Sequence, residues 1–178
     1  MIAKKERDQF DLADGELMEV KKYTDPVYDG LYEKPIKIGV VGYSKQDFNR
    51  GYAEMDMFLA LHNVKHTFET TRQKTIRVEL VSGLTDLGIP AIAYRLVTSV
   101  FPRELVKTVG IACEKAKDFK QFPVDERHII GTDWGDESDF FLDNIDCLIR
   151  IGGGNQSMQE VETFKQRYPG KLVLEYEL

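Results

Sequence analysis

Six short runs of β-branched and other apolar residues, separated by segments long enough to form helices, constrain the fold of this chain more than any other feature. The runs are IKIGVVG, IRVELVSG, KTVGIAC, RHIIG, IDCLIRIGG and KLVLEYE. Strands that are apolar along their whole length are buried on both faces, as in parallel sheets covered by helices on either side. Strands that alternate with helices are typical of repeated βαβ units. The sequence therefore predicts an α/β fold, Rossmann-like and doubly wound, with a mostly parallel sheet.

The length of 178 residues suits one domain with one site. Residues 1–34 are charged and rich in turn-forming residues, so we expect a short N-terminal extension followed by a domain over 35–178. Within the extension, apolar residues at helical spacing predict a helix over about 4–22, interrupted by Gly15. Within the domain, helices are expected at about 51–61, 89–100, 137–142 and 157–167.

Charge and hydropathy exclude several classes of function. With 24 basic and 30 acidic residues the chain has a formal net charge of −6, which disfavours binding to nucleic acid. No apolar run approaches the roughly 20 residues of a membrane span, and the first residues lack the apolar core of a signal peptide. The sequence therefore predicts a soluble cytoplasmic protein with no membrane association.

Metal and disulfide chemistry are also disfavoured, and no cofactor is expected. Cys113 and Cys147 each lie in an apolar run, where cysteine usually serves as a small buried hydrophobe. His62 and His66 are four residues apart but follow the expected end of a helix, with no third ligand near them in sequence.

Three glycine-rich turns follow predicted strands and precede predicted helices. In an open parallel sheet such turns gather at the carboxyl ends of the strands, where ligands bind. The first is Gly42-Tyr43-Ser44, where glycine allows close backbone approach and the Ser44 hydroxyl can donate to an oxyanion.

The second turn lies in VSGLTDLGIP, with Gly83, Thr85, Asp86 and Gly88 as its candidate ligand-binding residues. The helix that follows carries Pro90 in its first turn, and its exposed amide groups would favour an anion. Because Asp86 opposes a bare phosphate, its expected role is to cap the helix or to accept a hydrogen bond from a ribose hydroxyl. A capped turn with no ligand explains the same residues equally well.

The third turn has three consecutive glycines, Gly152, Gly153 and Gly154, between a buried strand and an amphipathic segment. Three glycines in a row carry a high entropic cost unless something must approach the backbone closely. Ser157 and Glu160 then form an S-x-x-E pattern, which is also that of a capping box. A ligand site and a helix cap are both consistent with this pair.

These motifs resemble the superfamily that groups the Lonely Guy phosphoribohydrolases with DNA-processing protein A and the SLOG sensor domains. The phosphoribohydrolase signature D-A-F-I-A-L-P-G-G-x-G-T-x-x-E aligns without gaps over Asp146 to Glu160. The segment SGLTDLGIPAIA resembles the family's earlier glycine turn, and its VSGL opening resembles that of DNA-processing protein A. The resemblance covers about residues 36–176 and implies a nucleotide-type ligand.

The departures from the signature bear on the choice between an enzyme and a binding protein. Gly152 replaces the signature proline and Gln156 replaces a glycine, while Glu137 and Ser138 stand where the hydrolases have an Arg-Lys pair. Losing that arginine removes a bidentate phosphate clamp.

The resemblance also assigns roles to individual residues. It implies that Gly153, Gly154, Gln156 and Ser157 hold a phosphate, and that Glu160, in an enzyme, stabilises positive charge at the sugar carbon or positions a water.

Three further side chains are candidates outside the turns. Trp134 is the only tryptophan and lies in the polar loop GTDWGDES, where it can act as a stacking platform for a base or simply pack on a helix. Arg150, in the signature strand, and Arg95 are the basic residues best placed to replace the missing clamp.

The leading hypothesis is a protein that binds a nucleotide-derived small molecule, ADP-ribose-like or a cyclic nucleotide signal, and senses or sequesters it without turnover. The rival is a nucleoside 5'-monophosphate phosphoribohydrolase with Glu160 as the catalytic residue. A third reading, a single-strand nucleic-acid binder, conflicts with the acidic charge. The resemblance also implies a homo-oligomer, in which a helix beside the glycine turn completes the partner's pocket.

Overall fold

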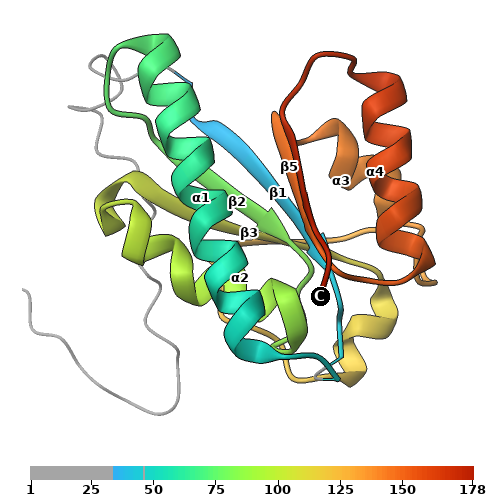
Figure 1. Cartoon of the computed structure of the whole chain (residues 1–178). Helices are drawn as coiled ribbons and strands as arrows, with labels where there is room; N and C mark the ends of the chain where they lie inside the picture. Colours follow the sequence, from blue (N-terminus) through green and yellow to red (C-terminus); the bar gives the residue numbers. More distant parts are fainter. Residues whose placement is uncertain (1–33, 46) are drawn as a thin grey trace, which may run out of the picture.

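The structure, a computed structural model that describes residues 34–45 and 47–178, contains a six-stranded sheet in the order β4-β3-β2-β1-β5-β6. All neighbouring strands are parallel, so the predicted doubly wound α/β fold is confirmed (Figure 1). The strands are β1 (Ile36–Gly42), β2 (Val78–Ser82), β3 (Val106–Ala112), β4 (Glu126–Ile129), β5 (Cys147–Ile151) and β6 (Val173–Tyr176). The helix expected over 4–22 lies outside the described residues.

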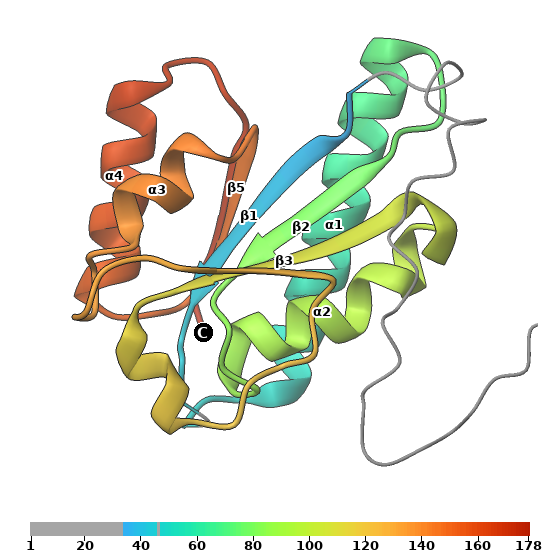
Figure 2. The same ribbon diagram turned by 180° about the vertical axis from the view of Figure 1, so that it is seen from behind.

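Two pairs of helices cover the two faces of the sheet. The helices are α1 (Arg50–Arg72), α2 (Gly88–Val100), α3 (Ser138–Asp143) and α4 (Asn155–Arg167), with short 3-10 helices η1 (Arg103–Leu105) and η2 (Glu114–Asp118). Helices α1 and α2 pack on one face, and α3 and α4 on the other (Figures 1 and 2). None of the helices in the described part of the chain is long and apolar enough to span a membrane.

Helix α1 is eleven residues longer at its carboxyl end than the predicted 51–61. Its apolar stripe continues through Val64, which is buried, and Phe68, which is partly buried against the core. The helix ends at Gln73, whose backbone is left-handed (φ 54°) and whose N–H donates to the Glu69 carbonyl. His62 and His66 therefore lie within the helix rather than after it, and the described residues contain no cluster of metal ligands.

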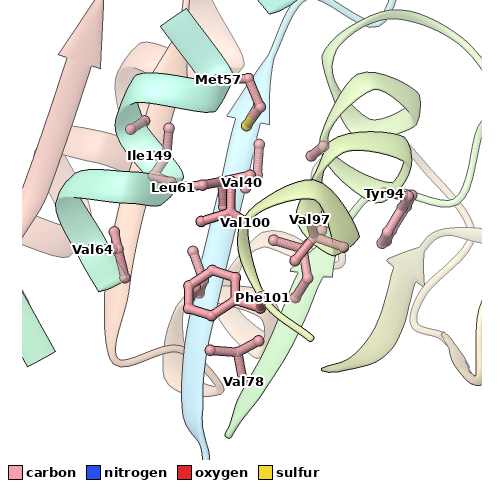
Figure 3. Close-up of a cluster of buried hydrophobic side chains, with 14 of the residues drawn as sticks. Val40, Met57, Leu61, Val64, Val78, Tyr94, Val97, Val100, Phe101 and Ile149 are labelled. Carbon is pink, nitrogen blue, oxygen red and sulfur yellow. The ribbon is translucent and has the colours of Figure 1, made fainter. Parts of the chain in front are cut away.

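The main hydrophobic core lies between the sheet and the helices α1 and α2. Figure 3 shows Met57, Leu61 and Val64 of α1 facing side chains of the strands, with Val97 and Val100 of α2 beside them. Both cysteines are buried free thiols, as expected, and burial raises the pKa of Cys147 to about 12. That thiol is therefore protonated at neutral pH and serves as a packing group.

The winding reverses between β1 and β5, which are neighbours in the sheet. The chain leaves β1 toward α1 on one face and leaves β5 toward α4 on the other. Connections that depart in opposite directions open a crevice at the carboxyl ends of the two strands, and this is where doubly wound folds bind ligands.

Candidate functional site

A cavity of about 570 Å³ occupies this crevice. All three glycine-rich turns contribute to its walls, together with residues of β3, α3 and the loop before α3. Its volume lies within the range of ordinary small-molecule pockets. The expectation that the three turns meet at one edge of the sheet is therefore met in the structure.

The turn after β1 is tied to the start of α2. The Tyr43 carbonyl accepts a hydrogen bond from the Ile89 N–H at 2.8 Å. Gly42 lies so close to β5 that an added Cβ would stand 2.3 Å from the Ile151 carbonyl oxygen. Gly42, Ser44 and Lys45 line the cavity.

The turn after β2 is divided between two hollows. Gly83 and Thr85 line the main cavity, whereas Asp86 and Gly88 line a separate hollow beside α2. Asp86 pairs with Arg95 and, at 2.7 Å, with the Nζ atom of Lys120. The Lys120 hydrogen bond is the main cause that lowers the pKa of this carboxyl below its usual value.

The expected capping role of Asp86 is not realised, and its carboxylate is instead engaged by Arg95 and Lys120. No side chain caps α2, whose N-cap residue is Leu87. Gly88 has a left-handed backbone (φ +60°), and an added Cβ would stand 2.0 Å from the Tyr43 carbonyl oxygen. Both residues therefore hold the protein's own loops together.

The turn after β5 is built by backbone conformations that only glycine adopts easily. Gly152 has φ +54° and Gly153 has φ +104°, and an added Cβ on Gly153 would meet the Ser157 hydroxyl at 2.1 Å. Neither of these two is among the residues that line the cavity, and their backbone conformations set the path of the chain from β5 into α4. Gly154 does line the cavity and is the N-cap residue of α4, where no side chain caps the helix.

The S-x-x-E pattern is not a capping box in the structure. Helix α4 begins at Asn155, so Ser157 and Glu160 both lie inside it. The Ser157 hydroxyl donates to the Gly154 carbonyl at 2.9 Å. Ser157, Glu160 and Gln156 line the cavity.

Glu160 is held in place by two donors. Its Oε1 atom accepts hydrogen bonds from the Ser138 hydroxyl at 2.6 Å and from the Gln156 side-chain amide at 3.2 Å. Burial raises the pKa of Glu160, and the negative charge of Glu137 adds to this effect, while the two hydrogen bonds oppose it. A buried carboxylate with a shifted pKa in a cleft is a common feature of functional sites.

Glu137 is the buried carboxylate of the cavity lining that the sequence analysis did not count among the ligand-binding residues. It is 8% exposed, lines the cavity with Glu160, and accepts a hydrogen bond from the Gly135 N–H through Oε2 at 3.1 Å. The available signals were its place among the acidic residues around Trp134, which favour a solvated loop, and its gapless alignment with a functional position of the resembled family.

Trp134 lines the cavity and is 48% exposed, and its ring meets that of Phe119 edge-on with 6.0 Å between ring centroids. Apart from Glu137, the acidic side chains of the loop around Trp134 are bonded to the protein's own groups. Asp133 pairs with Lys115, and Asp136 accepts from the backbone N–H groups of residues 132 and 133.

The two arginines proposed as replacement phosphate clamps do not line the cavity. Arg150 is buried, pairs with Glu175 and Glu177 near the carboxyl terminus, and donates to the Gly152 carbonyl at 2.9 Å. Arg95 is engaged with Asp86. Among the described residues that line the cavity, Lys45 is the one basic side chain.

Comparison with known proteins identifies the fold. No family model matches the chain, and no curated protein matches it. The solved structure of Moco Carrier Protein from Chlamydomonas reinhardtii is similar, with a TM-score of 0.52 and 20% sequence identity over 82% of this chain and 78% of that chain. At this identity the similarity establishes the α/β fold alone.

Proposed function

We propose that the chain binds a nucleotide-derived small molecule in the cavity between β1 and β5 and holds it without turnover. The observation that carries this proposal is the convergence of three strand-to-helix turns on one cavity of about 570 Å³, next to a helix start that no side chain caps.

The turn between β5 and α4 is the proposed phosphate end of the site. The first amide groups of a helix have no partner within the helix and carry a partial positive charge, so they favour an anion. Gly154, Gln156 and Ser157 line the cavity at this helix start, and Lys45 adds a positive charge to the lining. No arginine of the described residues lines the cavity, which supports reversible binding rather than a tight bidentate clamp.

The apolar part of the lining supports a ring system at the other end of the ligand. Ile111 of β3, Phe141 of α3 and the indole of Trp134 all face the cavity. Aromatic side chains and apolar walls bury the faces of planar heterocycles. The similar solved structure is named as a carrier, and holding a ligand without converting it is the behaviour that we propose here.

A hydrolase is the second candidate, and the environment of Glu160 favours it. A buried carboxylate that two neighbouring side chains hold in position can stabilise an oxocarbenium-like centre. This enzyme would cleave a nucleoside 5'-monophosphate into free base and ribose phosphate.

A thermal-shift screen against nucleoside monophosphates, NAD, ADP-ribose and cyclic nucleotides, followed by chromatography of each hit, separates the two candidates. A ligand at a hundredfold excess over its Kd stabilises the fold by about 2.7 kcal/mol. Recovery of the intact ligand supports the binding protein. Base plus sugar phosphate supports the hydrolase, and Glu160→Gln would then bind without turnover, with the exposed Glu162→Gln on the same helix as control.

Gly154→Val tests the phosphate end directly. The Gly154 backbone is extended (φ −94°, ψ −162°), and an added Cβ meets no atom within 4 Å, so valine fits the fold while occupying the space beside the helix start. We expect the ligand-induced shift to disappear in this variant. An unchanged shift with a folded Gly154→Val protein would place the ligand elsewhere.

A further inference from the structure

Two carboxylates of the cavity lining each have one oxygen without a hydrogen-bond partner among the described residues. Both hydrogen bonds to Glu160 end on Oε1, which leaves Oε2 free, and the bond to Glu137 ends on Oε2, which leaves Oε1 free. Among the described residues, every fully shielded side-chain oxygen or nitrogen has a partner. The two free oxygens are therefore open to solvent, and since both side chains line the cavity, we place them at its wall.

The carboxylate of Glu137 shares one short turn with the indole of Trp134. Two residues separate them in sequence, and the N–H of one of these, Gly135, donates to Glu137. Both side chains line the same cavity, and Phe119 packs against the indole from its edge. One short turn thus supplies both an aromatic ring and a hydrogen-bond acceptor to the lining of the cavity.

The charges of the lining favour a ligand that donates hydrogen bonds at this wall. Lys45 is accompanied by three carboxylates, those of Asp47, Glu137 and Glu160. A carboxylate accepts hydrogen bonds only, and leaving a charged acceptor unpaired in a partly buried site is costly. A ring that presents an acceptor to these oxygens is repelled, and a ring that presents donors is attracted.

We propose that the ring bound beside Trp134 carries a 2-amino-4-oxo edge, as in guanine and pterins, whose ring N–H and exocyclic amine donate to Glu137 and Glu160. This inference rests on the proposed function and names its ligand class. Adenine presents one exocyclic amine flanked by ring-nitrogen acceptors and therefore fits the two carboxylates poorly. A ribose diol also donates, but the indole next to Glu137 favours a planar ring, which stacks on it.

Calorimetric titration of the full chain with GMP, IMP, AMP and 6-hydroxymethylpterin tests this inference. GMP should bind at least tenfold more tightly than AMP, with IMP between them because it lacks the exocyclic amine. Each charge-assisted hydrogen bond contributes about tenfold in affinity. Comparing the affinities for GMP and for 6-hydroxymethylpterin shows whether the ligand that carries this edge is a nucleotide or a free pterin.

Trp134 is the sole tryptophan, so its fluorescence reports stacking directly. GMP should quench this fluorescence, and Trp134→Ala should weaken GMP binding, whereas truncation of an exposed aromatic on α1, Tyr52→Ala, should not. Glu137→Gln keeps an acceptor for the Gly135 N–H while removing the charge. It should lower GMP affinity about tenfold and leave AMP affinity unchanged, with Glu162→Gln as the matched control.

AMP binding as tightly as GMP, or an equal effect of Glu137→Gln on both nucleotides, would overturn the ring assignment and leave the nucleotide-binding proposal standing. Failure of all four probes to bind would overturn the ring assignment, whereas the nucleotide-binding proposal would fall only if the wider thermal-shift screen with NAD, ADP-ribose and cyclic nucleotides also gave no shift.

Discussion

The turn after β2 and the turn after β5 are built from similar residues but end in different states. Each carries at least one glycine in the left-handed region and leads to a helix whose N-cap residue makes no side-chain capping bond. In the turn after β2, the carboxylate of Asp86 is engaged by Arg95 and Lys120. In the turn after β5, Gly154 and the first residues of α4 line an open cavity instead.

The difference shows that glycines next to a helix start are not enough to make a site. What matters is whether side chains from elsewhere in the chain neutralise the polar groups of the turn. Lys120 lies 34 positions from Asp86 and neutralises the turn after β2. The turn after β5 leads instead to Glu160, which lies near a second carboxylate, Glu137.

The largest expected difference between the two turns is in their tolerance of alanine. Gly88→Ala puts a Cβ 2.0 Å from a backbone oxygen at φ +60°, and should lower the free energy of unfolding by about 3 kcal/mol. Gly154→Ala meets open space and should lower it by less than about 1 kcal/mol. Urea unfolding followed by circular dichroism measures both free energies. Equal losses would contradict the conclusion that the turn after β2 is closed by the protein's own contacts while the turn after β5 is open.

The next largest expected difference in unfolding free energy concerns the cationic side chain that is bonded to each turn, Arg150 or Lys120. Arg150 is buried below the turn after β5, so Arg150→Met should lower the free energy of unfolding by about 2 kcal/mol. Lys120 is 83% exposed in its side chain, and Lys120→Met should change the unfolding free energy by less than about 1 kcal/mol. A ligand-induced thermal shift that is lost in Arg150→Met while the protein stays folded would argue that Arg150 does contact the ligand.

A smaller effect is expected from the pH dependence of Asp86. Its folded pKa lies below the usual value of 3.8, chiefly because Lys120 donates to it, so the ionised form stabilises the fold. This contribution is complete above pH 3.8 and is lost as the pH falls through the lowered folded pKa. Asp86→Asn should therefore be less stable than the parent chain at pH 7, and the two should converge in acid when unfolding is followed against pH.

The smallest expected effect concerns Glu160, whose ionisation destabilises the fold whereas that of Asp86 stabilises it. Burial raises its folded pKa above the usual value of 4.5, so ionisation at neutral pH opposes folding. The penalty develops as the pH rises from 4.5 through the raised folded pKa. Glu160→Gln, which can still accept from Ser138, should be slightly more stable than the parent chain at pH 7 and equal to it below pH 4.5. A destabilised variant at pH 7 would show that the Ser138 and Gln156 hydrogen bonds outweigh burial.

Local sequence patterns were sufficient to predict the six strands and the edge of the sheet at which the cavity forms. All six predicted strands form, because each is a short apolar run that must be buried on both faces. The extent of α1 was missed by eleven residues because polar positions after residue 61 hide the continuing stripe of Val64 and Phe68. The cavity forms where the glycine turns predicted it, since parallel strands share one carboxyl edge.

Partners of charged side chains could not be predicted in the same way. Arg150 and Asp86 were candidate ligand contacts, and each pairs with a side chain 25 or more positions away, Asp86 also with Arg95 nearer in sequence. Glu137 joins Glu160 only because α3 and α4 pack on the same face of the sheet.

The sequence by itself determined the strands, the doubly wound α/β class and the edge at which the glycine turns meet, because hydrophobic periodicity and glycine conformation act over a few residues. Only the tertiary structure decided which of those turns stays open and which carboxylates face the cavity. Ion pairs and hydrogen bonds between distant elements are set by packing, and local sequence patterns do not show which distant elements pack together.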